Sequence, residues 1–380
     1  MLKTIFKTVF VICVVLIMTG TSWSAEPIKI GALFSVTGPP SFLGDPERNT
    51  AVMLQDQINK AGGINGRPLK VIVYDTQGDA TKAVQAANRL IKEDRVSAII
   101  GPSTTGETMA VIPVVEAAGI PLISCAAGIK ITEPVKKWVF KTAQNDSLAV
   151  ERIYEHLRKQ NIYNIAILTV SDGFGSSGRE QLKLKAKVYG ITITSDETYG
   201  PKDTNMMAQL TKIRGSKAQA LICWGTNPGP AIIARNAKQA GLKMPLYMSH
   251  GVSSKKFIEL AGSAAEGIML PSGRVIVAKL LPKSDPQKKS LLDYVNNYKK
   301  RFRVEGDHFG GHAWDAVMLL KYAIERGGDS PSNIRGWLEY TTNFKGIGGI
   351  FNFSAQDHAG LTKDAFVLVT IKNKDWALVK

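Results

Sequence analysis

The chain has 380 residues and a formal net charge of +16, from 48 Lys and Arg against 32 Asp and Glu. That length predicts two lobes of ordinary domain size, each able to bury its own core. The charge does not indicate a nucleic-acid binder, because no aromatic side chains interleave the basic runs. These runs are typical of solvated helix faces, with long-range attraction of anionic ligands or a membrane surface as the alternative. They are short and scattered: Lys136-Lys137, Lys255-Lys256, Lys288-Lys289 and Lys299-Lys300-Arg301.

The N-terminus has the pattern of a secretory signal peptide. Lys3 and Lys7 precede an apolar run at 9–18, and the small residues Ser22 and Ser24 suit cleavage after Ser24. The run is short for a membrane-spanning helix, although an uncleaved anchor is the alternative. We therefore expect residues 1–24 to be removed and the protein to be periplasmic, where it does not meet nucleic acid.

From residue 28 onward, strand-like and helical segments alternate. Alternation of this kind predicts βαβ units and a parallel sheet whose two faces are both covered by helices. The first part of the chain has apolar strands at 28–35, 69–75, 96–102 and 120–128, and helical segments at 45–62, 80–94 and 107–119.

The same rhythm then starts again and predicts a second α/β lobe. Its helical segments are 150–160, 178–190, 206–216 and 229–241, and its strands are 164–170, 191–199, 218–225 and 245–251. After Arg274 the pattern changes to long helices at 290–302 and 311–328 and a final pair of strands at 366–372 and 376–380. Two such lobes predict a cleft between them. Open α/β sheets bind ligands beyond the carboxyl ends of their strands, so the loops there are the candidate site.

Cysteine and histidine usage gives little support to a metal or cofactor site. Cys125 and Cys223 remain after processing, each in a strand-like run. We expect two separate buried thiols in different lobes, with a disulfide as the alternative in an exported protein. The five histidines are dispersed. His308 and His312 flank Gly310-Gly311, which weakens the helix that would align them as ligands.

The loop after the third predicted strand, residues 101–108, reads GPSTTGET. Its spacing is one residue short of a phosphate-binding P-loop, and Glu107 stands where that motif has Lys. Ser103, Thr104 and Thr105 instead bring hydroxyls to a helix N-terminus, where backbone amides suit a single carboxylate. The alternative is that one hydroxyl only caps the helix.

Two further groups of loop residues are candidates for the cleft. Ala126, Ala127 and Gly128 follow the next strand and allow a ligand to approach the backbone closely, with a plain tight turn as the alternative. Trp224, Thr226 and His250 follow later strands and could face the cleft. An inward Trp is more often part of the core than of a binding wall.

Residues 173–178, GFGSSG, match the dinucleotide-binding fingerprint, and Asp196 lies about twenty residues further on. We disfavour that interpretation because the motif lies in the second lobe and an exported protein has little access to NAD. Phe174 would then present an aromatic face to the cleft. No nucleophile elbow or metal-hydrolase helix motif occurs in the sequence. The sequence therefore does not indicate a catalytic triad, although a triad need not be visible in sequence.

Three segments together resemble one family. Residues 34–91, which include AGGINGR, are similar to the leucine/isoleucine/valine-type substrate-binding proteins of bacterial ABC transporters, as are IIGPSTTGET at 99–108 and IPLIS at 120–124. The resemblance covers essentially the whole mature chain. It implies a type I periplasmic binding fold, with two doubly wound α/β lobes, three hinge crossings and a ligand cleft. The implied lobes are 25–145 with 276–348, and 146–275 with 349–380.

The resemblance also implies the site. In that family a hydroxyl in the loop occupied here by Ser103, Thr104 and Thr105 holds the ligand carboxylate, together with the loop occupied by Ala126, Ala127 and Gly128. An aromatic position of the first lobe falls on Phe42 or Leu43. The aromatic positions of the closing lobe fall on Phe174 and near Trp224 to Thr226.

Two departures from the family bear on the ligand. No hydroxyl lies near Gly128, and His250 replaces the acidic residue that pairs with an α-ammonium group. Residues 35–47, 103–110 and 133–142 are instead similar to the aromatic-acid-binding branch. We expect a small carboxylate, with an aromatic or related acid ahead of a branched-chain amino acid. The resemblance implies a monomer that delivers this ligand to membrane permease subunits, with an exported sensor module or an enzyme as alternatives.

Overall fold

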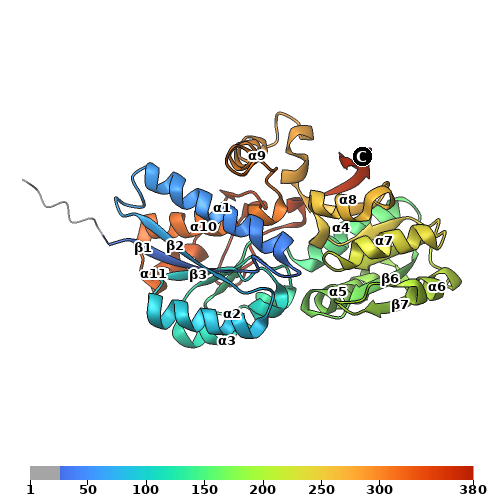
Figure 1. The fold of residues 1–380 in the computed structure, drawn as a ribbon, viewed down its shortest axis with the longest axis horizontal. Helices are drawn as coiled ribbons and strands as arrows, with labels where there is room; N and C mark the ends of the chain where they lie inside the picture. Colours follow the sequence, from blue (N-terminus) through green and yellow to red (C-terminus); the bar gives the residue numbers. More distant parts are fainter. Residues whose placement is uncertain (1–25, 380) are drawn as a thin grey trace, which may run out of the picture.

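The computed structural model describes residues 26–379, so the signal peptide expected at 1–24 lies outside the described residues. Two large sheets organise these residues, one in each lobe, and helices cover both faces of each sheet (Figure 1). This arrangement confirms the two doubly wound α/β lobes that the alternating sequence predicts. Within the described residues, no helix combines the length and apolar character needed to cross a membrane.

The first sheet has the order β2-β1-β3-β4-β5, and all its strands are parallel. Its strands are β1 (Ile28–Phe34), β2 (Leu69–Asp75), β3 (Ala98–Ile100), β4 (Leu122–Ser124) and β5 (Val139–Lys141). The helices around it are α1 (Ser41–Lys60), α2 (Ala80–Arg89), α3 (Thr105–Ala118), α10 (His308–Gly327) and α11 (Pro331–Glu339). Phe34 packs with α1 and α10, whereas the adjacent Leu33 packs with α2 and α3. The strands are apolar on both faces because each face is covered.

The second sheet has the order β14-β13-β10-β9-β8-β6-β7. It is parallel except at β13, which pairs antiparallel with β10 and with β14. Its strands are β6 (Asn164–Val170), β7 (Thr192–Tyr199), β8 (Ala220–Trp224), β9 (Leu246–Met248), β10 (Met269–Gly273), β13 (Phe366–Lys372) and β14 (Asp375–Leu378). The helices of this lobe are α4 (Asp146–Lys159), α5 (Gly173–Tyr189), α6 (Met207–Gly215), α7 (Gly229–Gln239) and α8 (Lys255–Ala261).

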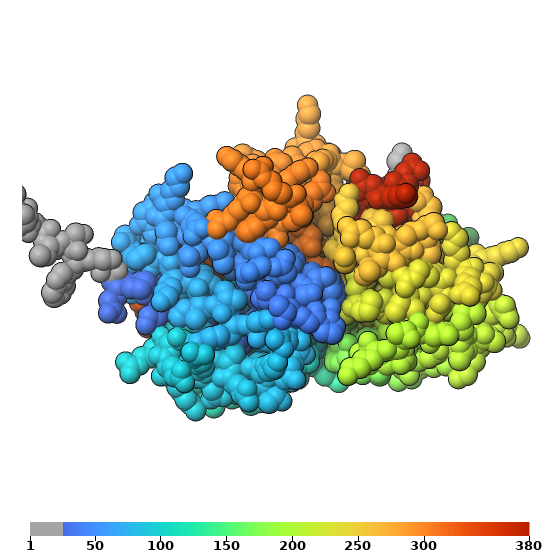
Figure 2. All heavy atoms as spheres, viewed as in Figure 1, coloured from blue at the N-terminus to red at the C-terminus, as the bar shows by residue number. Residues whose placement is uncertain are grey.

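The chain passes between the lobes in three places within the described residues. The first passage joins β5 to α4, and the second leaves β10 after Gly273. The second leads through a 3-10 segment, η5 (Arg274–Leu280), to α9 (Lys288–Phe302), which lies between the lobes at the top of Figure 1. In the space-filling view the lobes touch along one boundary, with the orange atoms around α9 above it (Figure 2).

The third passage lies further along the chain than the boundary expected at 348/349. The small hairpin of β11 (Phe344–Lys345) and β12 (Ile350–Phe351) is followed by residues that still pack in the first lobe. Ala365 belongs to that first-lobe core, and Phe366 belongs to the core of the second lobe. The chain therefore passes from the first-lobe core to the second-lobe core at the start of β13. The alternation of strands and helices in the sequence does not locate this boundary.

The expected weakness around Gly310 and Gly311 is wrong, because α10 begins at His308 and continues through both glycines. Asp307 caps this helix by accepting a hydrogen bond from the Gly310 amide, at 3.0 Å. The glycines are needed for packing: a Cβ at Gly310 would lie 2.2 Å from the hydroxyl of Tyr294. The helix therefore accommodates two glycines in its first turn, because Gly310 lies close to α9 and Gly311 lies close to Ile347.

The two described cysteines confirm the expectation of separate thiols. Cys125 lies in the first-lobe core and Cys223 in the second, and both are buried and unpaired. Burial raises the pKa of each thiol, so neither is a reactive thiolate at neutral pH.

Candidate functional site

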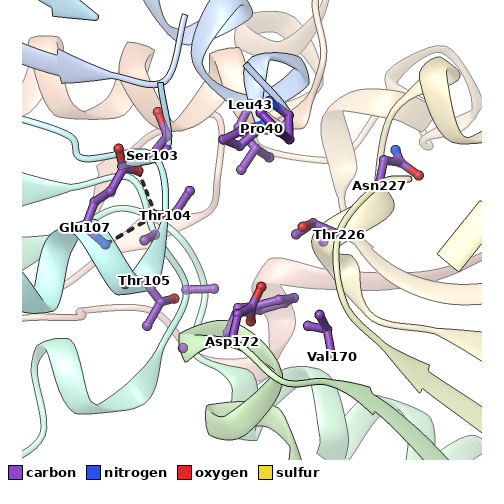
Figure 3. A pocket seen from close by; sticks show the side chains of 18 of the residues that line it. Pro40, Leu43, Ser103, Thr104, Thr105, Glu107, Val170, Asp172, Thr226 and Asn227 are labelled. Carbon is purple, nitrogen blue, oxygen red and sulfur yellow. Dashed lines mark hydrogen bonds between the residues drawn. The ribbon is translucent and has the colours of Figure 1, made fainter. Parts of the chain in front are cut away.

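A cavity of about 420 Å³ lies between the two lobes, at the carboxyl ends of the parallel strands. Figure 3 shows the first lobe on one side, with Pro40, Leu43 and Thr105, and the second lobe on the other, with Thr226 and Asn227. Nine of the twelve side chains expected at the site line it: Leu43, Ser103, Thr104, Thr105, Ala126, Ala127, Phe174, Thr226 and His250.

The first turn of α3 contributes hydrogen-bond donors to this cavity. Thr104 is the N-cap, and its hydroxyl accepts from the Glu107 amide at 3.3 Å. The amides of Thr105 and Gly106 come next and have no acceptor within residues 26–379, as is usual in a first helical turn. Both residues line the cavity, so this turn presents unused donors and the positive end of the helix dipole to it.

The hydroxyl of Thr105 is the one side-chain hydroxyl of this loop whose hydrogen is unused. Its oxygen accepts from the Gly128 amide at 3.2 Å, which ties α3 to the loop after β4. A Cβ at Gly128 would lie 2.4 Å from the Thr105 methyl group, so this contact requires glycine. Gly128 does not itself line the cavity; it positions Thr105 from behind.

The other two hydroxyls of the loop are bound to buried carboxyl groups. Ser103 donates to Glu47, and Thr104 donates to Glu107 at 2.6 Å. Ser35 donates to the same Glu107 oxygen at 2.9 Å. Burial raises the pKa of Glu47 well above its ordinary value, which favours its neutral form. Ser103 and Thr104 therefore hold the loop in shape, which leaves Thr105 and the two amides for a ligand.

The aromatic walls differ from the sequence-based expectation. Phe42 lies in a separate cavity of about 690 Å³, and Phe309, which packs edge-on against it at 5.6 Å, lines the inter-lobe cavity instead. Trp224 is fully buried and lies behind Phe174, with 5.8 Å between ring centroids. Trp224 thus supports the cavity wall without forming it, because β8 directs this side chain into the core beneath α5.

The GFGSSG motif serves close packing around α5. A Cβ at Gly178 would lie 2.1 Å from the Trp224 indole nitrogen, and one at Gly175 would lie 1.8 Å from the Val170 carbonyl oxygen. Asp196 is bound by Arg179 through two hydrogen bonds of 2.7 and 2.8 Å, so its carboxylate is not available to a ribose. These contacts account for the fingerprint residues without a dinucleotide.

Two buried charged residues lie behind the ligand-facing loops and were not identified from the sequence. The Lys141 ammonium donates to the carbonyl oxygens of Ala127 and Gly128, at 2.6 and 3.3 Å. Burial lowers the pKa of Lys141 and raises that of Asp146, and each acts electrostatically on the other. Lys141, a charged residue at the end of an apolar strand, is the sequence signal that could have revealed this pair.

Ser177, which binds Asp146, links the two lobes. Ser177 of α5 donates to Asp146 and accepts from the Ile129 amide of the first lobe at 3.2 Å. Nearby, Lys130 of the first lobe and Glu180 of α5 form an exposed ion pair at 2.6 Å. The loop that carries Ala127 and Gly128 is therefore bound directly to the second lobe.

Three histidines line the cavity: His250 from the second lobe, and His308 and His312 from the N-terminal part of α10. Burial lowers the pKa of all three, that of His308 to about 4. The imidazoles are therefore neutral at neutral pH. Within residues 26–379, no group of three His, Cys, Asp or Glu side chains is arranged to hold a metal ion.

The structure has two sheets covered by helices, three passages of the chain between the lobes and a cavity between the lobes. Together these features define a binding protein of the type I periplasmic fold. The family described as "Periplasmic binding protein" matches residues 27–375, and the chain belongs to that family.

Relatives of known name share this architecture. The chain is 29% identical over 314 residues to the leucine-, isoleucine-, valine-, threonine- and alanine-binding protein of Pseudomonas aeruginosa, with 81% of each chain covered. An extracellular ligand-binding receptor from Rhodopseudomonas palustris HaA2 superposes with a TM-score of 0.88 at 26% identity, covering 93% of this chain and 100% of that one. A branched-chain amino acid transporter substrate binding protein from Streptococcus pneumoniae, solved with isoleucine, gives 0.82 at 25% identity and covers 93% and 100%.

Proposed function

We propose that this protein is the periplasmic solute-binding component of an ABC importer and that its ligand is a small carboxylate. The observation that carries this proposal is the first turn of α3. It presents the Thr105 hydroxyl and the amides of Thr105 and Gly106 to a cavity between two lobes. Uncharged donors at a helix N-terminus suit a single carboxylate, since a few aligned hydrogen bonds satisfy it. The names of the relatives support the transport role.

An aromatic or related acid is the preferred ligand, ahead of a branched-chain amino acid. Leu43, Phe174 and Phe309 give the cavity apolar and aromatic surface. The position that the family uses for an acidic partner of the α-ammonium is His250, which is neutral here. A buried ammonium without an anionic partner costs several kcal/mol.

One observation favours the branched-chain amino acid as a second candidate. Asp172 lines the cavity on the second-lobe side (Figure 3), and only one of its oxygens is used to cap α5, at 2.8 Å from the Gly175 amide. An α-ammonium group could pair with the other oxygen. The relatives named for leucine, isoleucine and valine agree with this candidate.

In the proposed mechanism the protein binds its ligand and carries out no reaction on it. The first lobe captures the carboxylate, and contacts from the second lobe stabilise a closed form. The ligand shifts the equilibrium only by its greater affinity for that form. The closed form then docks on the membrane permease subunits, and other proteins of the importer hydrolyse ATP.

The deciding experiment is calorimetric titration of the purified mature protein with benzoate-type acids and with leucine, combined with tryptophan fluorescence. We expect aromatic acids to bind and leucine to bind more weakly or not at all. Tight leucine binding without aromatic-acid binding would refute the preferred ligand, and no heat with either class would refute the carboxylate.

Uptake separates the importer from the exported sensor of the same fold. Reconstituted vesicles with the cognate permease should accumulate the bound acid only when this protein is added. Recovery of chemically unchanged acid from the closed complex would exclude turnover by an enzyme.

A further inference from the structure

The cavity lining contains buried polar groups that the carboxylate site does not use. His250, His308 and His312 are 3%, 2% and 2% exposed, and all three line the cavity. Both ring nitrogens of His250, Nε2 of His308 and Nδ1 of His312 are buried without a hydrogen-bond partner. Leaving such groups unpaired costs about 1–3 kcal/mol each, so a folded protein that keeps them next to a cavity has a use for them.

These imidazoles come from opposite lobes. His308 and His312 lie one turn apart on α10, with ring centroids 4.4 Å apart, in the first lobe. His250 follows β9 in the second lobe, where its ring lies 5.4 Å from that of Phe174 and 5.2 Å from that of Phe366. A group held between them would contact both lobes at once.

The surrounding residues do not supply hydrogen-bond partners to these four nitrogens. Asp146 comes nearest to His250, but its Oδ1 lies 3.9 Å from the His250 Nε2, which is beyond hydrogen-bond range. The aromatic rings around His250 offer no hydrogen-bond acceptor of ordinary strength. His358 shows the contrast within this chain, because its two nitrogens lie 2.9 Å from the Val139 carbonyl and 3.2 Å from Glu339.

The chemistry of neutral imidazole selects the partner. Each ring has one N–H donor and one nitrogen acceptor. A hydroxyl can accept from one ring and donate to another, and a carbonyl can accept from one or two. An ammonium group would lose its water without gaining a negative partner from these rings, which is unfavourable in a buried site.

We infer that His250, His308 and His312 form a second recognition point in the cleft, which binds an uncharged oxygen substituent, hydroxyl or carbonyl, on the carboxylate ligand. This inference rests on the proposed function, since Thr105 and the start of α3 hold the carboxylate itself. It makes the ligand an oxygenated acid. It also makes the substituent part of lobe closure, because His250 comes from one lobe and His308 and His312 come from the other.

The test uses acids that differ in one substituent. Phenylacetate, mandelate, phenylglyoxylate and phenylglycine carry hydrogen, hydroxyl, carbonyl and ammonium at the same carbon, and benzoate is compared with meta- and para-hydroxybenzoate. Calorimetry on the wild-type protein should show at least one hydroxyl or carbonyl acid binding about tenfold or more tighter than its parent acid, as one or two satisfied buried groups predict. Phenylglycine should bind more weakly than phenylacetate.

Variants then assign the preference to the imidazoles. His250→Leu and His308→Leu should reduce the ratio of affinities between oxygenated and parent acid to about threefold or less. His308→Asn retains a donor and an acceptor and should keep most of the ratio. His156→Leu, on α4 outside the cavity, is the matched control and should not change it. Thermal unfolding verifies that each variant is folded.

Different failures have different meanings. If the wild-type protein binds parent and oxygenated acids equally, or if the histidine variants keep the wild-type ratio, the recognition point is refuted and the carboxylate site stands. If no acid of either series binds, the proposed function and this inference fall together. Thr105→Val provides the internal reference, because it should weaken every acid by the same factor.

Discussion

Gly173, the first residue of α5 in the second lobe, lies against Gly106 in the first turn of α3. A Cβ at Gly173 would be 3.2 Å from the Gly106 nitrogen and 3.3 Å from its Cα. Two helix N-termini from different lobes therefore meet beside the cavity, and the glycine at position 173 permits this approach. Because Gly106 also lines the cavity, contact between the lobes occurs beside the proposed carboxylate site.

Replacing Gly173 with valine should oppose lobe closure. The added side chain would push against backbone atoms of α3, and overpacking of this kind costs about 1–3 kcal/mol. We expect roughly five- to hundredfold weaker binding of the preferred acid, with unfolding stability almost unchanged. Small-angle scattering at saturating acid should give a larger radius for the variant than for the wild-type protein.

Gly215→Val is the control for this experiment. Gly215 ends α6, and a Cβ there would meet no atom within 4 Å. Equal affinities of the Gly173 and Gly215 variants would mean that the approach of α5 to α3 plays no part in closure.

Thr105→Val should remove the hydroxyl donor that we propose binds the ligand carboxylate. Valine keeps the shape of threonine and loses the hydroxyl, which also accepts from the Gly128 amide. A lost charge-assisted hydrogen bond predicts binding weaker by about 1–3 kcal/mol, measured by calorimetry. Thr105→Ser retains the hydroxyl and should bind almost normally. Unchanged affinity in the valine variant would remove Thr105 from the site.

Thr104→Ala should lower the stability of the protein without weakening ligand binding, in contrast to Thr105→Val. Thr104 caps α3 through the Glu107 amide, and its loss predicts about 0.5–2 kcal/mol lower stability. Affinity for the acid should change little once the protein is folded. Urea denaturation together with calorimetry separates this capping role from the binding role of Thr105.

Lys141→Met should destabilise the fold more than Thr105→Val or Thr104→Ala. It would remove a fully buried cation that binds two carbonyls and would leave Asp146 without its positive neighbour. Breaking a buried pair from one side costs about 3–5 kcal/mol. Adding Asp146→Asn should restore at least about 1 kcal/mol in urea denaturation, because the unpaired charge is gone. If the two changes are additive instead, the two groups are not coupled.

The sequence located the parts of the site that follow from local chemistry. The apolar run ending at Ile100 and the hydroxyls before α3 define a strand, a turn and a capped helix, and Thr105 follows from that pattern. Ala126 and Ala127 follow from the same reasoning at the next strand. The carboxyl ends of parallel strands must converge, so these loops meet without any knowledge of distant contacts.

The remaining parts depend on contacts that sequence order hides. Trp224 and Phe174 both appear at loop starts, and only the packing of α5 on β8 decides that Phe174 lines the cavity. Phe309 replaces Phe42 in the wall because α10 crosses α1 from more than two hundred residues further along the chain. His308 and His312 lie at helical spacing, but which face of α10 turns toward the cavity depends on how α10 packs on α1 and α11.

Lowering the pH should reduce the stability of the protein, because His308 is buried in its neutral form. Burial lowers its pKa from 6.5 to about 4, so the unfolded chain binds this proton first as the pH falls. Stability therefore decreases through the window between about pH 6.5 and 4. His308→Gln lacks this proton, and its unfolding free energy relative to wild type should rise by about 1–3 kcal/mol between neutral pH and about pH 4.

Urea denaturation at a series of pH values measures this difference. Burial also lowers the pKa of His250 and His312. Because the wild-type protein and the His308→Gln variant both retain these two residues, the difference between their unfolding free energies reports on His308. A difference that is constant across the series would mean that His308 binds its proton equally well in the folded protein.

Asp172→Asn distinguishes the two ligand candidates. Asn retains the cap on α5, because its carbonyl oxygen can still accept from the Gly175 amide, and it removes a carboxylate from the cavity lining. Benzoate-type acids should then bind equally or about two- to fivefold tighter, since a repulsive charge is gone. Leucine, if it pairs its ammonium with Asp172, should lose about tenfold or more. Calorimetry with both ligands decides between the two candidates, and Asp364→Asn is the control at an exposed carboxylate. If leucine binds the wild-type protein tightly and loses most of its affinity in the Asp172→Asn variant, the ligand is an amino acid.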